Sequence, residues 1–336
     1  MSGNCGKSLD NLSRNQRAMG DLSSAGALQL SREYFFQVAL PSLTRRFPTL
    51  TGRLAAGLAG NGSECFGYDD EISRDHDWGV DFYIWTLEQD RDSIPELADW
   101  KDELFKTHPP GFRREKSSHG AQIAVMTCGD FYYDLIGVKG LPGSINEWLR
   151  PPEEHYSMAV NGAVFIDNPG VFTGIRNGLL RYYPEDIRRK RIAAKCMALA
   201  QTGQYNHERV AKRGDTVTLW TVLSRFTDSA IAMVYLLNKV YRPYYKWAFR
   251  ALNDLPVLGR DASNILLCIA ENYGLDSTSF ARRQECISDL CRFFVAELKA
   301  QSLSDADDWF LAFHGESVQS RIENGPLRSL PAQYEI

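Results

Sequence analysis

Strand-like patterns are confined to the first half of this chain of 336 residues, and this confinement is what most constrains the fold. Runs with a strand pattern, rich in small, aromatic or β-branched residues, are found before about residue 170 and do not reappear after it. Beyond that point, apolar residues recur at spacings of three and four, the period of an α-helix. We therefore predict an α+β fold, with a small mixed sheet and flanking helices followed by an all-helical bundle.

These patterns predict two domains and a tail. Residues 1–27, rich in Ser, Gly and Asn, are expected to be a loose tail, 28–169 an α/β domain, and 170–336 a helical domain. Ser31 is a candidate N-cap for the first helix. The expected strands are 54–60, 80–85, 121–127 and 163–167. The expected later helices are 94–107, 184–203, 215–241, 261–273, 278–301 and 304–314.

Composition and charge exclude several classes of protein. With 44% hydrophobic and 24% charged residues, the chain is neither wholly disordered nor collagen-like nor a coiled coil. A net charge of -4 argues against general nucleic-acid binding. The longest apolar run, 230–237, is too short to span a bilayer, and the N-terminus lacks a signal-peptide pattern. Seven scattered cysteines without a CxxC motif are typical of reduced thiols, so we expect a cytoplasmic protein.

Two short motifs close together in the sequence predict a site for phosphate and a metal ion. Gly62-Ser63 follows the first predicted strand and, after eleven residues, Asp75-x-Asp77 precedes the second. Carboxylates two residues apart point to the same side of a strand and can converge on Mg²⁺ or Mn²⁺. A glycine turn exposes backbone N–H groups to a phosphate, and serine adds a hydroxyl. Together they indicate metal-assisted attack on a nucleoside triphosphate (NTP), although each motif alone is more often a solvated turn.

This pattern resembles the signature of the nucleotidyltransferase superfamily, which includes the aminoglycoside nucleotidyltransferases and DNA polymerase β. The block 62–79 more closely resembles an uncharacterised bacterial family of that superfamily, domain of unknown function 4037. Four further blocks are similar to the same family: 161–167, 182–186, 237–247 and 317–322.

The resemblance implies roles for individual residues. Gly62 and Ser63 would bind the β- and γ-phosphates, and Asp75 and Asp77 would hold the metal. The superfamily often adds a third carboxylate on a later strand. Here Gln122 stands where an acid is expected, which leaves Asp167 or Asp130 to take that catalytic role. An arginine often follows the Gly-Ser pair, but this chain has Glu64 there, and Arg74 is its first basic residue after the pair.

Two basic stretches are secondary candidates. Lys239, Tyr241, Tyr245 and Lys246 lie where the long predicted helix ends, and could stack a nucleobase and neutralise phosphates; the alternative is a solvated helix end. The run 188–191, with the nearby Lys195, could contact RNA or an anionic substrate. Such a run is more often one solvated face of a helix, and we expect that here.

The predicted activity is Mg²⁺-dependent transfer of a nucleoside monophosphate (NMP) from an NTP to a hydroxyl group. The acceptor is not identified by the sequence. A small molecule such as an antibiotic suits the size and acidity of the chain best, and protein or RNA acceptors remain open. The rival hypothesis is a degenerate module that binds a nucleotide or a partner without chemistry. Markers of Rossmann dehydrogenases, P-loop ATPases, α/β-hydrolases and zincins are missing.

Overall fold

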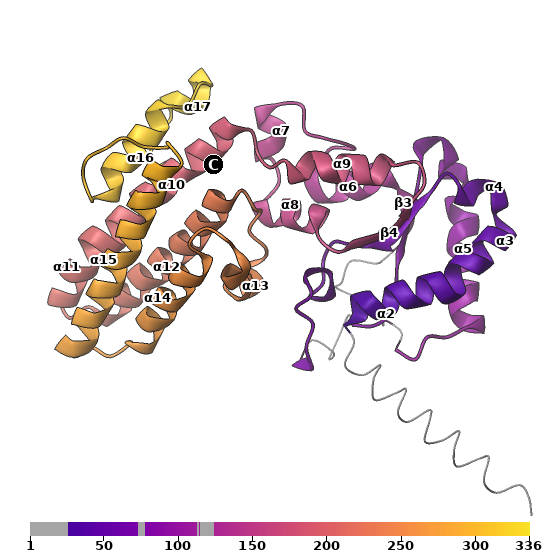
Figure 1. Cartoon of the computed structure of the whole chain (residues 1–336), viewed down its shortest axis with the longest axis horizontal. Helices are drawn as coiled ribbons and strands as arrows, with labels where there is room; N and C mark the ends of the chain where they lie inside the picture. The colour runs from indigo at the N-terminus through magenta and orange to yellow at the C-terminus, as the bar shows by residue number, and fades with distance from the viewer. Residues whose placement is uncertain (1–25, 73–77, 113, 115–123) are drawn as a thin grey trace, which may run out of the picture. The chain divides into compact units, whose positions relative to one another are not determined.

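The structure is a computed structural model that describes residues 26–72, 78–112, 114 and 124–336 (Figure 1). Its internal contacts divide the chain into two units. The first comprises Met1–Leu141 with Met158–Leu179, and the second comprises Pro142–Ser157 with Leu180–Ile336. A sheet lies in the first unit, and the described residues of the second are helical or irregular. The α+β class is thereby confirmed, and residues 142–157 group with the helical unit although they precede residue 170.

Four strands form a mixed sheet in the first unit. They are β1 (Ala55–Leu58), β2 (Tyr83–Thr86), β3 (Val125–Thr127) and β4 (Ala163–Asp167), in the order β3-β2-β1-β4. β1 is antiparallel to both β2 and β4, and β2 is parallel to β3. The end of β1 and the starts of the other three strands therefore lie at one edge of the sheet, which we call the Ser63 edge. Each predicted strand run overlaps one observed strand, and the 121–127 run lies partly outside the described residues.

Helices cover both faces of this sheet. The helices of the first unit are α2 (Ala27–Tyr34), η1 (Phe35–Ala39), α3 (Leu40–Arg46), α4 (Pro48–Thr51), η2 (Glu64–Phe66), η4 (Glu88–Ser93), α5 (Ile94–Thr107), α6 (Cys128–Ile136) and α9 (Val171–Leu180). On one face, Phe35 from η1 and Phe105 from α5 pack around Phe82. On the other, Trp85 of β2 stacks on Phe172 of α9, with ring centroids 3.8 Å apart. Alternation along β2 thus buries apolar side chains on both faces.

Two sequence predictions for helices of the first unit have different outcomes. α5 matches the predicted helix 94–107 at both ends. Ser31 as an N-cap is wrong, because α2 begins at Ala27 and Ser31 is buried inside it. Its hydroxyl donates to the Ala27 carbonyl, four residues earlier, at 2.7 Å. A serine within a helix commonly uses such a bond to satisfy its hydroxyl.

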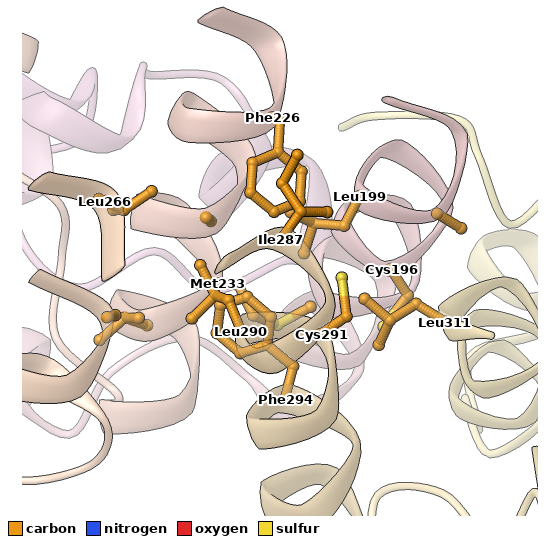
Figure 2. Packing of buried hydrophobic residues seen from close by; sticks show 14 of the residues in the cluster. Cys196, Leu199, Phe226, Met233, Leu266, Ile287, Leu290, Cys291, Phe294 and Leu311 are labelled. Atoms are coloured by element: carbon orange, nitrogen blue, oxygen red, sulfur yellow. The ribbon is translucent and has the colours of Figure 1, made fainter. Parts of the chain in front are cut away.

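The second unit is built on two long helices and a shared core. Its helices are α7 (Ile145–Leu149), α8 (Glu153–Val160, which continues into the first unit), α10 (Glu185–Leu199), η5 (Ala200–Asn206), α11 (His207–Lys212), α12 (Thr216–Asn238), α13 (Tyr245–Ala248), η6 (Arg250–Asp254), α14 (Gly259–Glu271), α15 (Ser277–Ala300), α16 (Leu311–Ser320) and α17 (Gly325–Ser329). Phe226 and Met233 of α12 pack with Leu290 and Phe294 of α15 in this core (Figure 2). Within the described residues, no helix combines the length and apolarity that crossing a membrane requires.

The predicted helix 304–314 is wrong over most of its length, since α16 begins only at Leu311. Short polar side chains before it bind the backbone locally instead. The Ser304 hydroxyl accepts from the Ala306 amide at 3.3 Å, and the Asp308 carboxylate accepts from the Phe310 amide at 2.8 Å. Such local bonds compete with helical ones. The helix predicted to end near residue 203 instead continues through the π-helical turn η5 into α11.

The basic run 188–191 is not a solvated helix face, so that prediction is also wrong. Arg188 is 2% exposed and donates to the Leu236 carbonyl at 2.8 Å. Lys190 is fully buried, and its ammonium donates to the carbonyls of Pro331 and Ala332 at 2.8 and 3.1 Å. Buried cations require such partners, because an uncompensated charge is costly inside a protein. The run therefore binds the end of α12 and the C-terminal segment to α10 through hydrogen bonds.

Gly57, in the middle of β1, provides a test of this sheet. A Cβ atom there would lie 2.4 Å from the Ala163 carbonyl oxygen of β4 and 3.0 Å from the Trp85 ring. We expect Gly57→Ala to destabilise the protein by about 1–3 kcal/mol, because β4 must move to relieve the overlap. Urea or thermal unfolding measures this change. Gly52→Ala is the matched control, since a Cβ there meets nothing within 4 Å. Equal stability of the two variants would contradict the described register.

Candidate phosphate-binding loop and its surroundings

The loop after β1 is held in place by the chain that enters β4. The Gly60 amide donates to the Asn161 side-chain oxygen at 2.8 Å, and the Asn161 side-chain amide donates back to the Gly60 carbonyl at 2.8 Å. The Gly162 amide adds a bond to the Cys65 carbonyl, also at 2.8 Å. Three hydrogen bonds between segments about a hundred residues apart therefore fix the loop against the Ser63 edge.

Gly62 and Ser63 lie within this fixed loop. Gly62 has a φ of 144°, a conformation that side chains with a Cβ rarely adopt, and a Cβ there would overlap the Glu64 carboxylate. The Ser63 carbonyl accepts from the amides of Phe66 and Tyr68 at 3.1 and 2.9 Å. No hydrogen bond within the described part of the chain uses the Ser63 hydroxyl or the amides of Gly62 and Ser63. These three donors suit an anion such as phosphate.

Glu64 stands where the resemblance leads one to expect an arginine, and the structure buries it. Its carboxylate forms an ion pair with Arg114, and the two side chains are only 2% and 7% exposed. Burial raises the pKa of the Glu64 carboxyl group, and the Arg114 guanidinium offsets part of that rise. A buried and paired Glu64 repels a nearby phosphate much less than a free surface carboxylate would.

The strand that follows the two predicted metal ligands starts at the same edge. Arg74, Asp75 and Asp77 lie outside the described residues. Just after them, the Trp78 indole donates to the Asp69 carboxylate at 2.8 Å, and the Ala27 amide donates to the same carboxylate at 2.7 Å. The chain then enters β2, whose first residues pair with the end of β1. The sheet thus brings the start of β2 and the Gly62-Ser63 turn to one edge.

Asp167 lies at the opposite edge of the sheet. It pairs with Ala55, the first residue of β1, whereas Gly62 and Ser63 follow the last, Leu58. At strand rise, the length of β1 alone separates the two edges by about 10 Å. Both Asp167 oxygens also accept backbone amides, from Gly170 at 2.9 Å and Thr173 at 2.7 Å. These bonds satisfy the start of α9, so the structure does not bring Asp167 to the loop.

Asp130, the other carboxylate considered, follows β3 at that same opposite edge. It pairs with Arg91 at 2.8 Å and with Lys139 at 3.1 Å. The hydrogen bonds from Arg91 lower the pKa of Asp130 to about 2. Asp130 is therefore an ionised member of a surface charge network, distant from Ser63.

Asp81 is a carboxylate at the Ser63 edge that sequence reasoning missed. It lies two residues before β2 starts at Tyr83, and its carboxylate pairs with Lys101 at 2.7 Å. The Lys101 side chain is 8% exposed, and its ammonium lies 5.0 Å from the centre of the Phe82 ring. Spacing offered a signal, because Asp81 continues the two-residue alternation of Asp75 and Asp77. Among the residues that the structure describes, no group of three or more His, Cys, Asp or Glu side chains could hold a metal ion.

The candidates in the second unit differ in accessibility. Lys239 ends α12 in the left-handed conformation, with its ammonium exposed and 3.6 Å from Glu185. Tyr245 is 72% exposed, and Lys246 is also exposed. Tyr241 is only 4% exposed and packs among Tyr156, Tyr182 and Tyr183. Its ring is therefore part of an aromatic core and is not available to stack on a nucleobase.

Tyr245 also lines a pocket of about 470 Å³ between α12, α13 and α14. The wall is mostly apolar, and an ion pair between Asp228 and Arg242 (2.7 Å) forms its polar side. Trp220, Tyr245 and Tyr273 contribute exposed aromatic rings. Volume and lining fall in the range of small-molecule sites. Nothing in the sequence pattern indicated this pocket, because it forms only where the successive helices α12, α13 and α14 pack against one another.

Comparison with known families supports part of the resemblance. Residues 148–248 match the model of a family described as a domain of unknown function, DUF4037. This segment contains Asp167 and the candidates between 239 and 246, but not Gly62, Ser63, Asp75 or Asp77. No curated protein and no solved structure matches the chain significantly.

The Glu64–Arg114 pair can be tested through stability and pH. We expect Arg114→Met to destabilise the protein by about 3–5 kcal/mol near neutral pH, because it leaves a buried carboxylate unpaired. Since the folded-state pKa of Glu64 is raised, the folded protein binds the proton more tightly than the unfolded chain does. Removing Arg114 takes away the charge that lowers the Glu64 pKa, so this pKa rises further in the variant. The loss should therefore be complete above the variant's Glu64 pKa and shrink as the pH falls through it.

Denaturant unfolding of wild type and Arg114→Met across pH 4 to 8 measures this dependence. The double variant Glu64→Gln, Arg114→Met is the control, because it carries no buried charge at this position. We expect it to recover part of the lost stability and to lose the extra pH dependence. A single variant whose stability deficit does not change with pH would contradict an unpaired, ionised Glu64.

Proposed function

We propose that the protein is a Mg²⁺- or Mn²⁺-dependent nucleotidyltransferase that moves an NMP group from an NTP to a hydroxyl group of an acceptor. The observation that carries this proposal is the shared edge of the sheet. The Gly62-Ser63 turn and the start of β2, the strand that follows Asp75-x-Asp77, both lie there. The family match over 148–248 agrees with the resemblance to domain of unknown function 4037, and the activity itself is inferred from the motif at 62–77.

In this proposal the residues of the chain mainly bind and orient the nucleotide. The Ser63 hydroxyl and the amides of Gly62 and Ser63 donate to phosphate oxygens. Asp75 and Asp77 hold the divalent cation, since paired carboxylates are the oxygen ligands that Mg²⁺ prefers. When bound, the cation would neutralise charge developing on the phosphates. Lys239, Tyr245 and Lys246 of the helical unit stay predicted nucleotide contacts in the proposal, whereas Tyr241 is buried among other tyrosines.

The acceptor is proposed to be a small hydroxylated molecule, with protein or RNA hydroxyls as lesser alternatives. One observation favours the rival function, a nucleotide-binding module without turnover. Of the carboxylates at described strand ends, Asp81 is neutralised by Lys101, and Asp130 and Asp167 lie at the opposite edge. A third catalytic carboxylate is therefore not among them.

Nucleotide binding separates these possibilities. We expect one or more NTPs to raise the melting temperature of the wild type only when Mg²⁺ or Mn²⁺ is present. Ser63→Ala should weaken that binding about 10- to 100-fold, the effect of losing one hydrogen bond to a charged group. Asp75→Asn or Asp77→Asn should remove the dependence on the cation. Thermal shift and isothermal titration calorimetry measure both effects.

Asp167→Ala is the matched carboxylate control at the other edge of the sheet. It should lower stability by about 1 kcal/mol through the lost amide bonds, and leave nucleotide affinity unchanged. Equal nucleotide affinity in the wild type, Ser63→Ala and Asp75→Asn proteins would contradict the proposed nucleotide-binding site. If the site binds, release of pyrophosphate with a panel of hydroxylated acceptors distinguishes an enzyme from a binding module.

A further inference from the structure

Two thiols meet in the second unit, at the margin of its shared core. Cys268 of α14 and Cys286 of α15 lie eighteen positions apart, and their Sγ atoms are 2.8 Å from each other. Neither is in a disulfide. An S–S bond is about 2.05 Å long, so the two sulfurs need to approach by less than about 1 Å to form one. α14 and α15 are consecutive helices that pack side by side, so the bond would require little movement of the backbone.

The surroundings favour reaction at Cys268. Its side chain is partly exposed, whereas Cys286 is 5% exposed. The Arg282 guanidinium, one turn before Cys286 on α15, contacts the Cys268 sulfur as well as Glu285; both contacts raise the pKa of Arg282. The Asn272 side-chain amide lies 3.7 Å from the same sulfur. Cys268 is therefore the sulfur of the pair that an oxidant in solution can reach.

Cys286 suits the second step instead. Burial raises its pKa to about 12, so it stays a thiol until its partner has reacted. Its position directly against Cys268 then makes it the nearest nucleophile to an oxidised Cys268 sulfur. An exposed thiol with a buried neighbour is the arrangement expected of a pair that forms a disulfide through a sulfenic acid.

We propose that Cys268 and Cys286 are a redox modification site, which a peroxide converts reversibly to a disulfide. The Cys268 thiolate attacks the peroxide, so that an S–O bond forms, the O–O bond breaks and, for hydrogen peroxide, water leaves after protonation. The Cys286 sulfur then attacks the Cys268 sulfur; the S–S bond forms, the S–OH bond breaks, and a second water leaves. Two thiols give up two electrons to one peroxide, and a dithiol reductant reverses the change.

The disulfide would restrict the movement of one wall of the 470 Å³ pocket. Leu266, Leu267, Ile269 and Ala270 of α14 line that pocket and flank Cys268 in sequence. A covalent link from Cys268 to α15 fixes this wall of the pocket to a neighbouring helix. Oxidation therefore restricts how far α14 can move when a molecule enters or leaves.

Cys196 and Cys291 provide an internal comparison. Both are fully buried in the core of the helical unit, where Figure 2 shows their side chains among apolar neighbours. Burial raises the pKa of both thiols. These cysteines have the same chemistry but no access to solvent, so a peroxide should leave them unmodified while the protein is folded.

The test is to oxidise the folded full-length protein with hydrogen peroxide, block remaining thiols, and map the peptides by mass spectrometry. We expect a Cys268–Cys286 link in the wild type, lost on treatment with dithiothreitol, and absent from Cys268→Ser. Cys291→Ala should still form it. The oxidised wild type should melt about 5–10 °C higher than the reduced protein, because a closed loop of this length restricts the unfolded chain.

Three results would overturn the proposal. The first is that both thiols remain blockable at peroxide concentrations that oxidise an exposed model thiol. The second is that Cys268 accumulates as sulfinic acid without a link to Cys286. The third is a link to a different cysteine. Peptide mapping of the wild type does not depend on any variant. It therefore decides the proposal even if the Cys268→Ser protein fails to fold. A link without a rise in melting temperature would contradict the expected restriction of the unfolded chain.

Discussion

The antiparallel course of β1 between β2 and β4 is the constraint on which the geometry of the first unit depends. Because β1 runs against both neighbours, its last residue meets the first residues of β2 and β4 at one edge. The loop that leaves β1 is then close to the segment that enters β4, and Asn161 closes the gap with two bonds to Gly60. Reversal of β1 alone would send Gly62 and Ser63 to the edge that now carries Asp130 and Asp167.

Buried charge is the second recurring feature of both units. Glu64 with Arg114, Asp81 with Lys101, and the cations of α10 each place an ionised group where water has little access. Such groups contribute little net stability compared with apolar replacements, but losing one partner is costly. They therefore specify which segments must lie together. In the first unit, two of these pairs lie beside the Ser63 edge and fix the approach to the candidate site.

Local pattern predicted those elements whose environment is local. The strands, α5 and the class of fold follow from residue type and period, because each has a continuous apolar face to bury. The prediction that Ser31 is an N-cap was wrong because a serine can either cap a helix or form a hydrogen bond within one. Contacts with neighbouring segments decide between these two roles. The expected exposure of Tyr241 and of the basic run 188–191 was wrong for a related reason. Aromatic and long cationic side chains suit both surface and interior, and their burial depends on segments far away in sequence.

The same reasoning limits what sequence could say of the candidate site. Gly62 and Ser63 were identifiable because a glycine turn after a strand has a local signature. The third carboxylate was not, because strand order and direction decide which acids share an edge. Asp167 and Asp81 illustrate this: both adjoin strands, yet only Asp81 is at the Ser63 edge, and Lys101 already neutralises it.

In the proposed function, nucleotide binding and catalysis depend on different groups at the Ser63 edge. The described part of the loop supplies hydrogen-bond donors, which suit a phosphate but remove no proton. The described strand ends supply no unneutralised carboxylate there, so in that proposal the proton of an attacking hydroxyl passes to another group, to solvent or to the phosphates themselves. The proposed binding therefore depends on Gly62 and Ser63 whatever the acceptor, whereas the proposed turnover depends on groups that the acceptor brings or that lie elsewhere. Such a loop can bind a nucleotide without turnover, so the two properties have to be measured separately.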